Sequence, residues 1–116
     1  MFKFEQREIP SYAQPVPSDQ LVEGETYFHV LYVDRGMKIP TISSLVYVGK
    51  NFGDDEVSTL YFQDVESYLA GVRITDENPD PDSARFESWP EASFHGVFDF
   101  EHALEELMKC SLRRRQ

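Results

Sequence analysis

The residues best suited to chemistry in this sequence are one cysteine, three histidines and many carboxylates. Cys110 lies late in a helical pattern, beside Lys109 and Arg113. Cationic neighbours can lower the pKa of a thiol, but the negative end of a helix dipole disfavours a thiolate. We therefore interpret Cys110 as a small residue at the edge of the core, and no Gly-x-Ser-x-Gly motif offers another nucleophile.

The three histidines do not form a metal-binding pattern. His29 lies within an apolar segment, whereas His95 and His102 are seven positions apart. No His-x-x-x-His spacing and no pair of cysteines occurs. A calcium-binding loop starting at Asp76 would need glycine where Pro81 stands. Phosphate-binding glycine motifs are also absent. The sequence thus indicates no catalytic residue, no metal ligand and no cofactor.

The negative charge is concentrated in one third of the chain. Of the 21 acidic residues, eleven lie within 54–91, where Arg73 and Arg85 are the bases, so this segment carries −9 of the formal net charge of −10. A field of this sign repels nucleic acids and anionic membranes and attracts basic proteins. We therefore expect no direct binding to nucleic acid or membrane.

Length and composition predict a single domain over 1–116 that is rich in sheet. Phe, Tyr and Trp make up 14% of the 116 residues, and aromatic side chains suit a half-buried pleated surface. No apolar run is long enough to span a membrane. One cysteine and an N-terminus without an apolar signal core indicate a cytoplasmic protein.

Two segments are strong strand candidates, 26–33 and 45–48. Asp34-Arg35-Gly36 predicts a turn with Gly36 at positive φ, leading into a short partner strand at 37–39. Pro40 predicts an edge or a bend there, because proline cannot donate to a ladder. Further strands are expected over 57–62 and 94–98.

The segment 64–74 allows two interpretations. Asp64 can cap a short helix that stops at Gly71 and precedes a strand near 72–74, which is the interpretation we prefer. The alternative is one strand over 68–74. The clearest element is a helix over 99–114, with Asp99 as its N-cap. Its apolar residues recur at the spacing of one helical face, and they are Phe100, Ala103, Leu104, Leu107, Met108 and Leu112.

These elements predict an α+β fold: five or six mostly antiparallel strands, curled or closed as an SH3-like barrel, with the C-terminal helix packed across one face or end. Prolines make 1–20 an extended arm, and prolines with acids make 75–91 a loop. The core is expected to comprise Phe28, Val30, Leu31, Val33, Leu45, Val46, Val48, Leu60, Phe62, Val97, Phe98, Leu104, Leu107 and Met108.

The leading functional hypothesis is a non-enzymatic protein-interaction module that binds a basic protein, as an inhibitor or immunity-type protein does. Aromatic residues among acids can combine a buried anchor with electrostatic steering. The expected contact residues are Asp54, Asp55, Glu56, Asp76, Glu77, Asp80, Asp82, Phe86 and Trp89. The alternative for the two aromatic residues is that they only attach the loop to the sheet.

A second hypothesis is a ligand-binding domain or small enzyme. Its pocket would be lined by strand residues Tyr27, His29, Tyr32 and Tyr47. A third alternative is a homo-oligomer formed through an exposed strand edge or through the helix.

Overall fold

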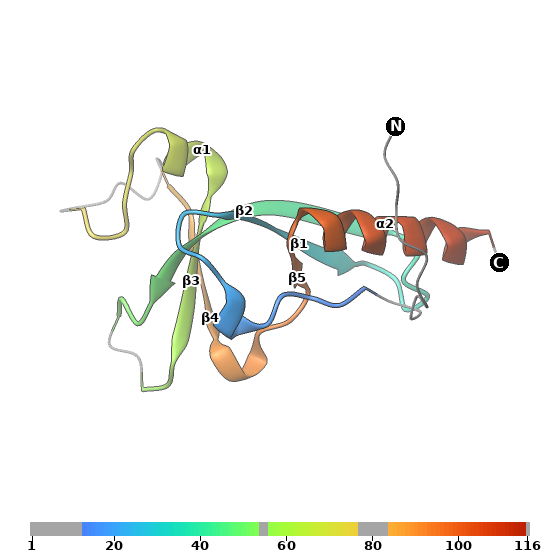
Figure 1. Cartoon of the computed structure of the whole chain (residues 1–116), viewed down its shortest axis with the longest axis horizontal. Coiled ribbons are helices and arrows are strands. Elements are labelled where there is room, and N and C mark those ends of the chain that lie inside the picture. Colours follow the sequence, from blue (N-terminus) through green and yellow to red (C-terminus); the bar gives the residue numbers. More distant parts are fainter. Residues whose placement is uncertain (1–12, 54–55, 77–83, 116) are drawn as a thin grey trace.

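The protein folds as one open antiparallel sheet with a long helix at its C-terminus (Figure 1). The computed structural model describes residues 13–53, 56–76 and 84–115. The elements in chain order are η1 (Ser18–Gln20), β1 (Thr26–Tyr32), β2 (Pro40–Lys50), β3 (Thr59–Asp64), α1 (Val65–Leu69), β4 (Phe86–Pro90), η2 (Glu91–Ser93), β5 (Val97–Phe98) and α2 (Phe100–Arg114). The strand order β4-β3-β2-β1-β5 leaves β4 and β5 at opposite edges, so the α+β prediction is confirmed, with an open sheet of five strands.

The hairpin of β1 and β2 forms the centre of the sheet. Its register pairs Tyr27 with Leu45 and Tyr32 with Pro40. Pro40 is the first residue of β2, and residues 40–44 pair with β1 alone because pairing with β3 begins at Leu45, so the prediction that Pro40 lies at an edge is confirmed. The predicted partner strand at 37–39 is wrong, since these residues belong to the connection between β1 and β2. In the connecting turn Met37 has the positive φ of 56°, in place of Gly36.

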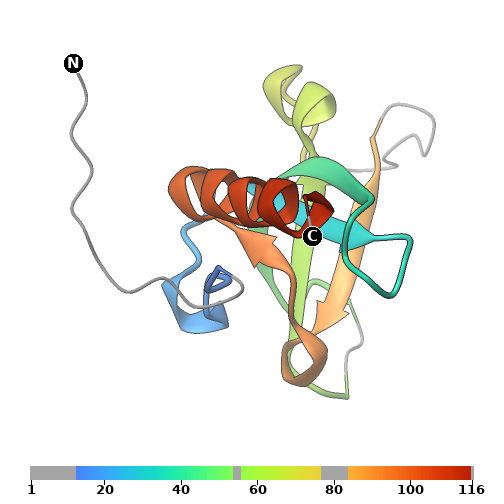
Figure 2. The same cartoon turned by 90° about the vertical axis from the view of Figure 1, so that its right-hand side faces the viewer.

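Side chains that alternate along the strands supply a separate core on each face of the sheet. One core consists of Tyr27, Leu45, Tyr47, Leu60, Phe62 and Val97, with Val16, Leu21, Trp89 and Phe94 packed against it. The other consists of Ala13, Val30, Phe98 and Ala103, with Phe28 and Tyr32 at its border. Figure 2 shows α2 on one side of the sheet and the chain around η1 on the other.

The proline-rich arm lies on the domain from Ala13 onwards. Ala13 is buried, and the backbone N–H of Val16 donates to the carbonyl of Val97 at 2.8 Å, so the arm covers part of the β5 edge. Residues 1–12 of the predicted arm lie outside the described residues.

Several local predictions need correction. The segment 72–74 is irregular and not a strand, although the capped helix before it is confirmed as α1, where Asp64 accepts from the Ser67 N–H. The predicted loop 75–91 contains strand β4, and residues 77–83 of that loop lie outside the described residues. The last strand is shorter than 94–98, because η2 and a turn precede β5.

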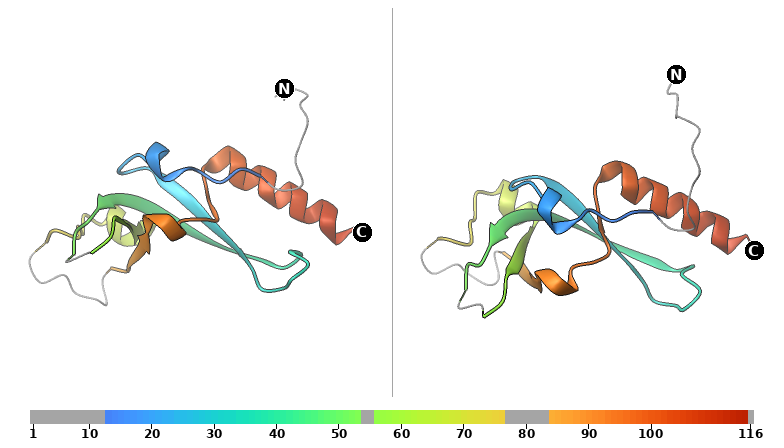
Figure 3. Two further views of the ribbon diagram at one scale, coloured as in Figure 1. Left: turned by 90° about the horizontal axis from the view of Figure 1, so that it is seen from below. Right: turned by 60° about the horizontal axis from the view of Figure 1, so that its bottom comes forward.

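Four of the predicted core residues are exposed: Leu31, Val33, Leu104 and Met108. Leu31 lies near the end of β1 and Val33 follows that strand, in the part of the hairpin where β1 pairs with β2 alone. Figure 3 shows the tip of this hairpin projecting from the rest of the sheet. Leu104 and Met108 are exposed because α2 faces the sheet with the side that carries its buried residues, such as Ala103 and Glu106, and not with its apolar side.

Candidate functional site

The acidic region, defined as residues 54–91, is built on β3, α1, β4 and their connections. In Figure 1 these elements lie at one end of the molecule, and the C-terminal part of α2 lies at the other. Of the predicted contact residues, Glu56 and Asp76 are exposed and Phe86 and Trp89 are partly buried on β4. The remaining five lie outside the described residues: Asp54, Asp55, Glu77, Asp80 and Asp82.

Most described carboxylates of the acidic region are not neutralised by a cation. Glu56, Glu66 and Glu87 are exposed, and none of them lies within ion-pair distance of a described lysine or arginine. The single ion pair that a described acid of this region makes joins Glu91 to Lys50, which lies outside the region, at 3.3 Å. Exposed carboxylates without a neighbouring cation therefore remain in the folded chain, and they are the source of the negative field that the sequence predicts.

Two carboxylates of the region serve the fold. Glu91 accepts hydrogen bonds from the Ser58 and Ser18 hydroxyls at 2.6 and 2.9 Å, and these bonds lower its pKa. Burial opposes ionisation of Asp64, but hydrogen bonds from the Arg85 N–H and from Ser67 outweigh burial and lower its pKa. Both groups therefore stay charged and anchored, and they hold β4 and η2 beside β3.

Trp89 is an anchor of the sheet. Its ring contacts those of His29, Phe62 and Phe94, with centroids 4.6, 5.8 and 6.0 Å away. Such edge-to-face contacts fix the ring in the core. The alternative interpretation of the sequence, in which the aromatic residue attaches the loop to the sheet, describes Trp89 in this structure.

The four residues of the predicted pocket do not lie together. Tyr27, His29 and Tyr47 point to the face that carries the larger core, whereas Tyr32 points to the face that carries α2. The Tyr27 hydroxyl accepts from the Val22 N–H at 2.9 Å, which gives it a structural partner.

His29 is the buried polar residue of the larger core. Burial lowers the pKa of its imidazole, so the ring is neutral near pH 7. Its Nε2 atom has no hydrogen-bond partner among the described residues. The described part of the chain holds no group of three or more His, Cys, Asp or Glu side chains placed to bind a metal ion.

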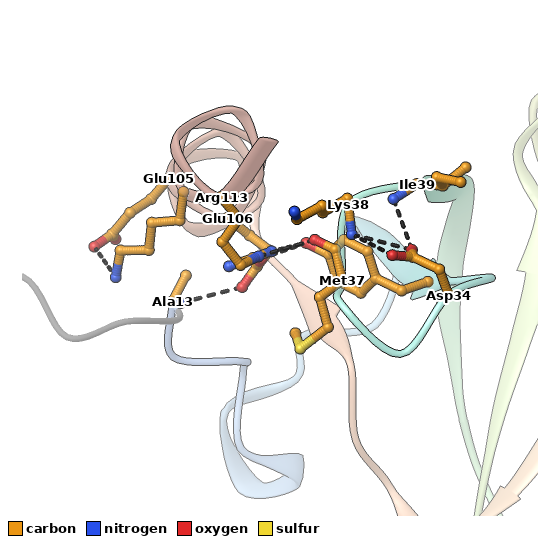
Figure 4. A network of polar contacts seen from close by, with 10 residues as sticks. Ala13, Asp34, Met37, Lys38, Ile39, Glu105, Glu106 and Arg113 are labelled. Atoms are coloured by element: carbon orange, nitrogen blue, oxygen red, sulfur yellow. Dashed lines mark hydrogen bonds and ion pairs between the residues drawn. The ribbon is translucent and has the colours of Figure 1, made fainter. Parts of the chain in front are cut away.

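A polar network on the opposite face ties α2 to three other segments (Figure 4). Glu106 is 2% exposed; it accepts from the Ala13 N–H at 3.2 Å, from Arg113 Nη2 at 2.8 Å and from the Tyr32 hydroxyl. Arg113 Nε also donates to the Met37 carbonyl at 2.8 Å. The network therefore joins the N-terminal arm, β1, the hairpin turn and α2.

Burial, hydrogen bonds and neighbouring charges set the protonation states of Glu106 and Tyr32 in this network. Burial alone would raise the pKa of Glu106, but hydrogen bonds from Tyr32 and Arg113 outweigh it and the pKa is lowered. Burial and the neighbouring Glu106 carboxylate raise the pKa of Tyr32 far above its usual value. Tyr32 is therefore a neutral donor and Glu106 a charged acceptor at physiological pH.

The inward side of α2 is small and polar, and this was missed from the sequence. Its buried residues are Ala103, Glu106, Lys109 and Cys110, and Lys109 Nζ lies 3.2 Å from Glu105 Oε1. The outward side carries the apolar row, defined as Phe100, Leu104, Met108 and Leu112, whose exposed fractions are 64, 56, 63 and 57%. The sequence signal for this orientation is the arc of α2 that contains Glu106, Lys109 and Arg113, because charged side chains on one arc can bind polar groups of other segments.

Comparison of the chain with protein-family models, with curated proteins and with solved structures gave no match. In the part of the chain that the structure describes, neither helix is both long and apolar enough to cross a membrane.

Proposed function

We propose that the protein is a non-enzymatic protein-interaction module of the cytoplasm, and that its acidic region binds a basic protein. The observation that carries the proposal is the exposure of Glu56, Glu66 and Glu87 without a described cation within ion-pair distance. Glu56 precedes β3, Glu66 follows it and Glu87 lies on the neighbouring strand β4, and unpaired carboxylates spread along such a surface attract a cationic partner and raise the rate of encounter. An inhibitor or immunity-type protein that neutralises a basic enzyme is one form of this function.

Several carboxylates of the acidic region lie on ordered secondary structure, which favours specific recognition over nonspecific electrostatic attraction. Trp89 fixes β4 in the core, and Asp64 holds the backbone at Arg85 through a 2.8 Å hydrogen bond. Glu87 lies on β4 between these two anchors, and Glu66 lies in the first turn of α1. Charges on ordered elements keep a fixed spacing, so they can match a particular pattern of lysines and arginines.

The proposal predicts that neutralising this surface weakens binding to basic proteins. The variant carries Glu56→Gln, Glu66→Gln, Asp76→Asn and Glu87→Gln, and the probe is a panel of small basic proteins studied by isothermal titration calorimetry. Exposed pairs contribute roughly 0.2–1 kcal/mol each, so we expect at least one probe to bind the variant about tenfold more weakly at low salt.

The control removes three acids elsewhere: Asp19→Asn, Glu23→Gln and Glu25→Gln. It changes the net charge by three units instead of four, so an effect of net charge alone would weaken both variants by similar factors. Equal weakening, or binding by the wild type that does not respond to salt, would contradict the proposal.

A further inference from the structure

The apolar row of α2 is the largest unexplained feature of the molecule. Its members are four positions apart, so each lies about 40° around the helix from the last and they form one continuous ridge. The sheet contacts this ridge at its N-terminal end, where the Phe100 ring packs edge-to-face on Phe28 of β1 at a centroid distance of 4.8 Å. All four side chains of the ridge stay more than half exposed, because α2 faces the sheet with the arc that contains Ala103, Glu106 and Cys110. Contiguous exposed apolar side chains on a folded protein mark an interaction surface.

The ridge is complementary to itself when it is reversed. If two copies of α2 lie antiparallel with a two-fold axis beside residue 106, Phe100 of one copy faces Leu112 of the other. Leu104 then faces Met108 in the same way. Every large apolar residue of the ridge meets another one, and the same contacts occur twice, as a two-fold interface requires.

The charges at the two ends of α2 select this antiparallel arrangement. Asp99 and Glu101 lie at the N-terminal end, and Arg114 and Arg115 are exposed at the C-terminal end. In the antiparallel pair Glu101 lies level with residue 111 of the second copy, about one turn from its Arg114 and Arg115. A parallel pair would instead place like charges together at both ends, which is unfavourable.

We infer that the protein forms a two-fold dimer through α2, with the apolar rows of two copies packed antiparallel. The acidic regions lie away from this interface, so the dimer presents two of them to a partner (Figure 1). The inference is independent of the proposed function, since a monomer could still bind a basic protein.

Analytical ultracentrifugation of the full chain across a concentration series tests the dimer. We expect the 13.5 kDa chain to associate to twice that mass, with dissociation in the micromolar range because one helix per copy buries a modest area. Leu104→Glu places a charge in the ridge and should raise the dissociation constant about 100-fold or more. A wild type that stays monomeric at every concentration would overturn the inference.

The matched control is Leu69→Glu, which replaces an exposed leucine on α1, far from the ridge. It should leave the dissociation constant unchanged, and circular dichroism should show equal helix content in both variants. Equal weakening by both variants would place the interface elsewhere and refute the inference.

Charge exchange tests the direction of the two helices. Glu101→Lys alone, and Arg114→Glu with Arg115→Glu alone, should each weaken the dimer, and the combination should restore affinity to within a few-fold of the wild type. A combined variant that is weaker than either one would contradict the antiparallel arrangement.

Discussion

Glu106 holds the N-terminal arm, β1 and α2 together through a single buried carboxylate. No sequence rule identified it, because its partners Ala13, Tyr32 and Arg113 are separated from it by 93, 74 and 7 positions. The sequence also could not place Trp89, whose type suits both a binding anchor and a core residue. Residues of this kind obtain their role from long-range contacts, so composition and spacing leave it open.

At the residue scale, we expect Glu106→Gln to lower the free energy of unfolding by about 1–3 kcal/mol, because it removes a charge that three donors satisfy. The pKa of Glu106 is lowered in the folded state, so its stabilising effect is complete above the ordinary value of 4.5 and is lost as the pH falls through the folded-state pKa. Urea unfolding at several pH values should therefore show the two proteins converging in acid.

The control for this prediction is Glu25→Gln, which changes an exposed glutamate outside α2 and outside the Glu106 network. Its unfolding curve should follow that of the wild type at every pH. A constant difference between Glu106→Gln and wild type down to strongly acidic pH would show that the carboxylate does not act through its charge.

At the element scale, the sequence predicts the helix caps correctly but not the side of α2 that faces the sheet. Asp99 and Asp64 were predicted as N-caps, and both accept a backbone N–H three residues later, at 2.9 and 3.0 Å. A cap depends only on its own turn, so the sequence suffices. Which side of α2 faces the sheet depends on partners from other segments. Glu106 and Arg113 bind Ala13, Tyr32 and Met37 from other segments, so their side of α2 faces inward and the apolar row stays exposed.

A prediction at this scale concerns the cap of α2. Asp99→Ala removes the acceptor for the His102 N–H and should destabilise the protein by about 1 kcal/mol. Asp99→Ser keeps a capping oxygen and should recover most of the loss. Thermal unfolding at one fixed protein concentration measures both variants, and equal stability of the alanine variant and wild type would show that this cap contributes nothing.

At the scale of the whole molecule, two surfaces of different chemistry lie apart. The acidic region is carried by β3, α1 and β4, and the apolar row is carried by α2 (Figure 1). The sequence predicted the charge asymmetry, because counting acids needs no fold. It also predicted β1, the second half of β2, β3 and the α+β class, since alternating apolar segments and turns are local patterns, but it assigned β4 to a loop. The exposed row could not be predicted, because the same apolar spacing also describes a helix that faces its own core.

The central claim is that the acidic region, and not the rest of the surface, recognises cationic protein. Nuclear magnetic resonance of the isotope-labelled protein, titrated with a lysine-rich peptide, tests it most directly. The account predicts that the amide signals of residues 56–76 and 84–91 shift and that those of α2 stay in place. Shifts that concentrate on α2, or that spread evenly over the sheet, would contradict it.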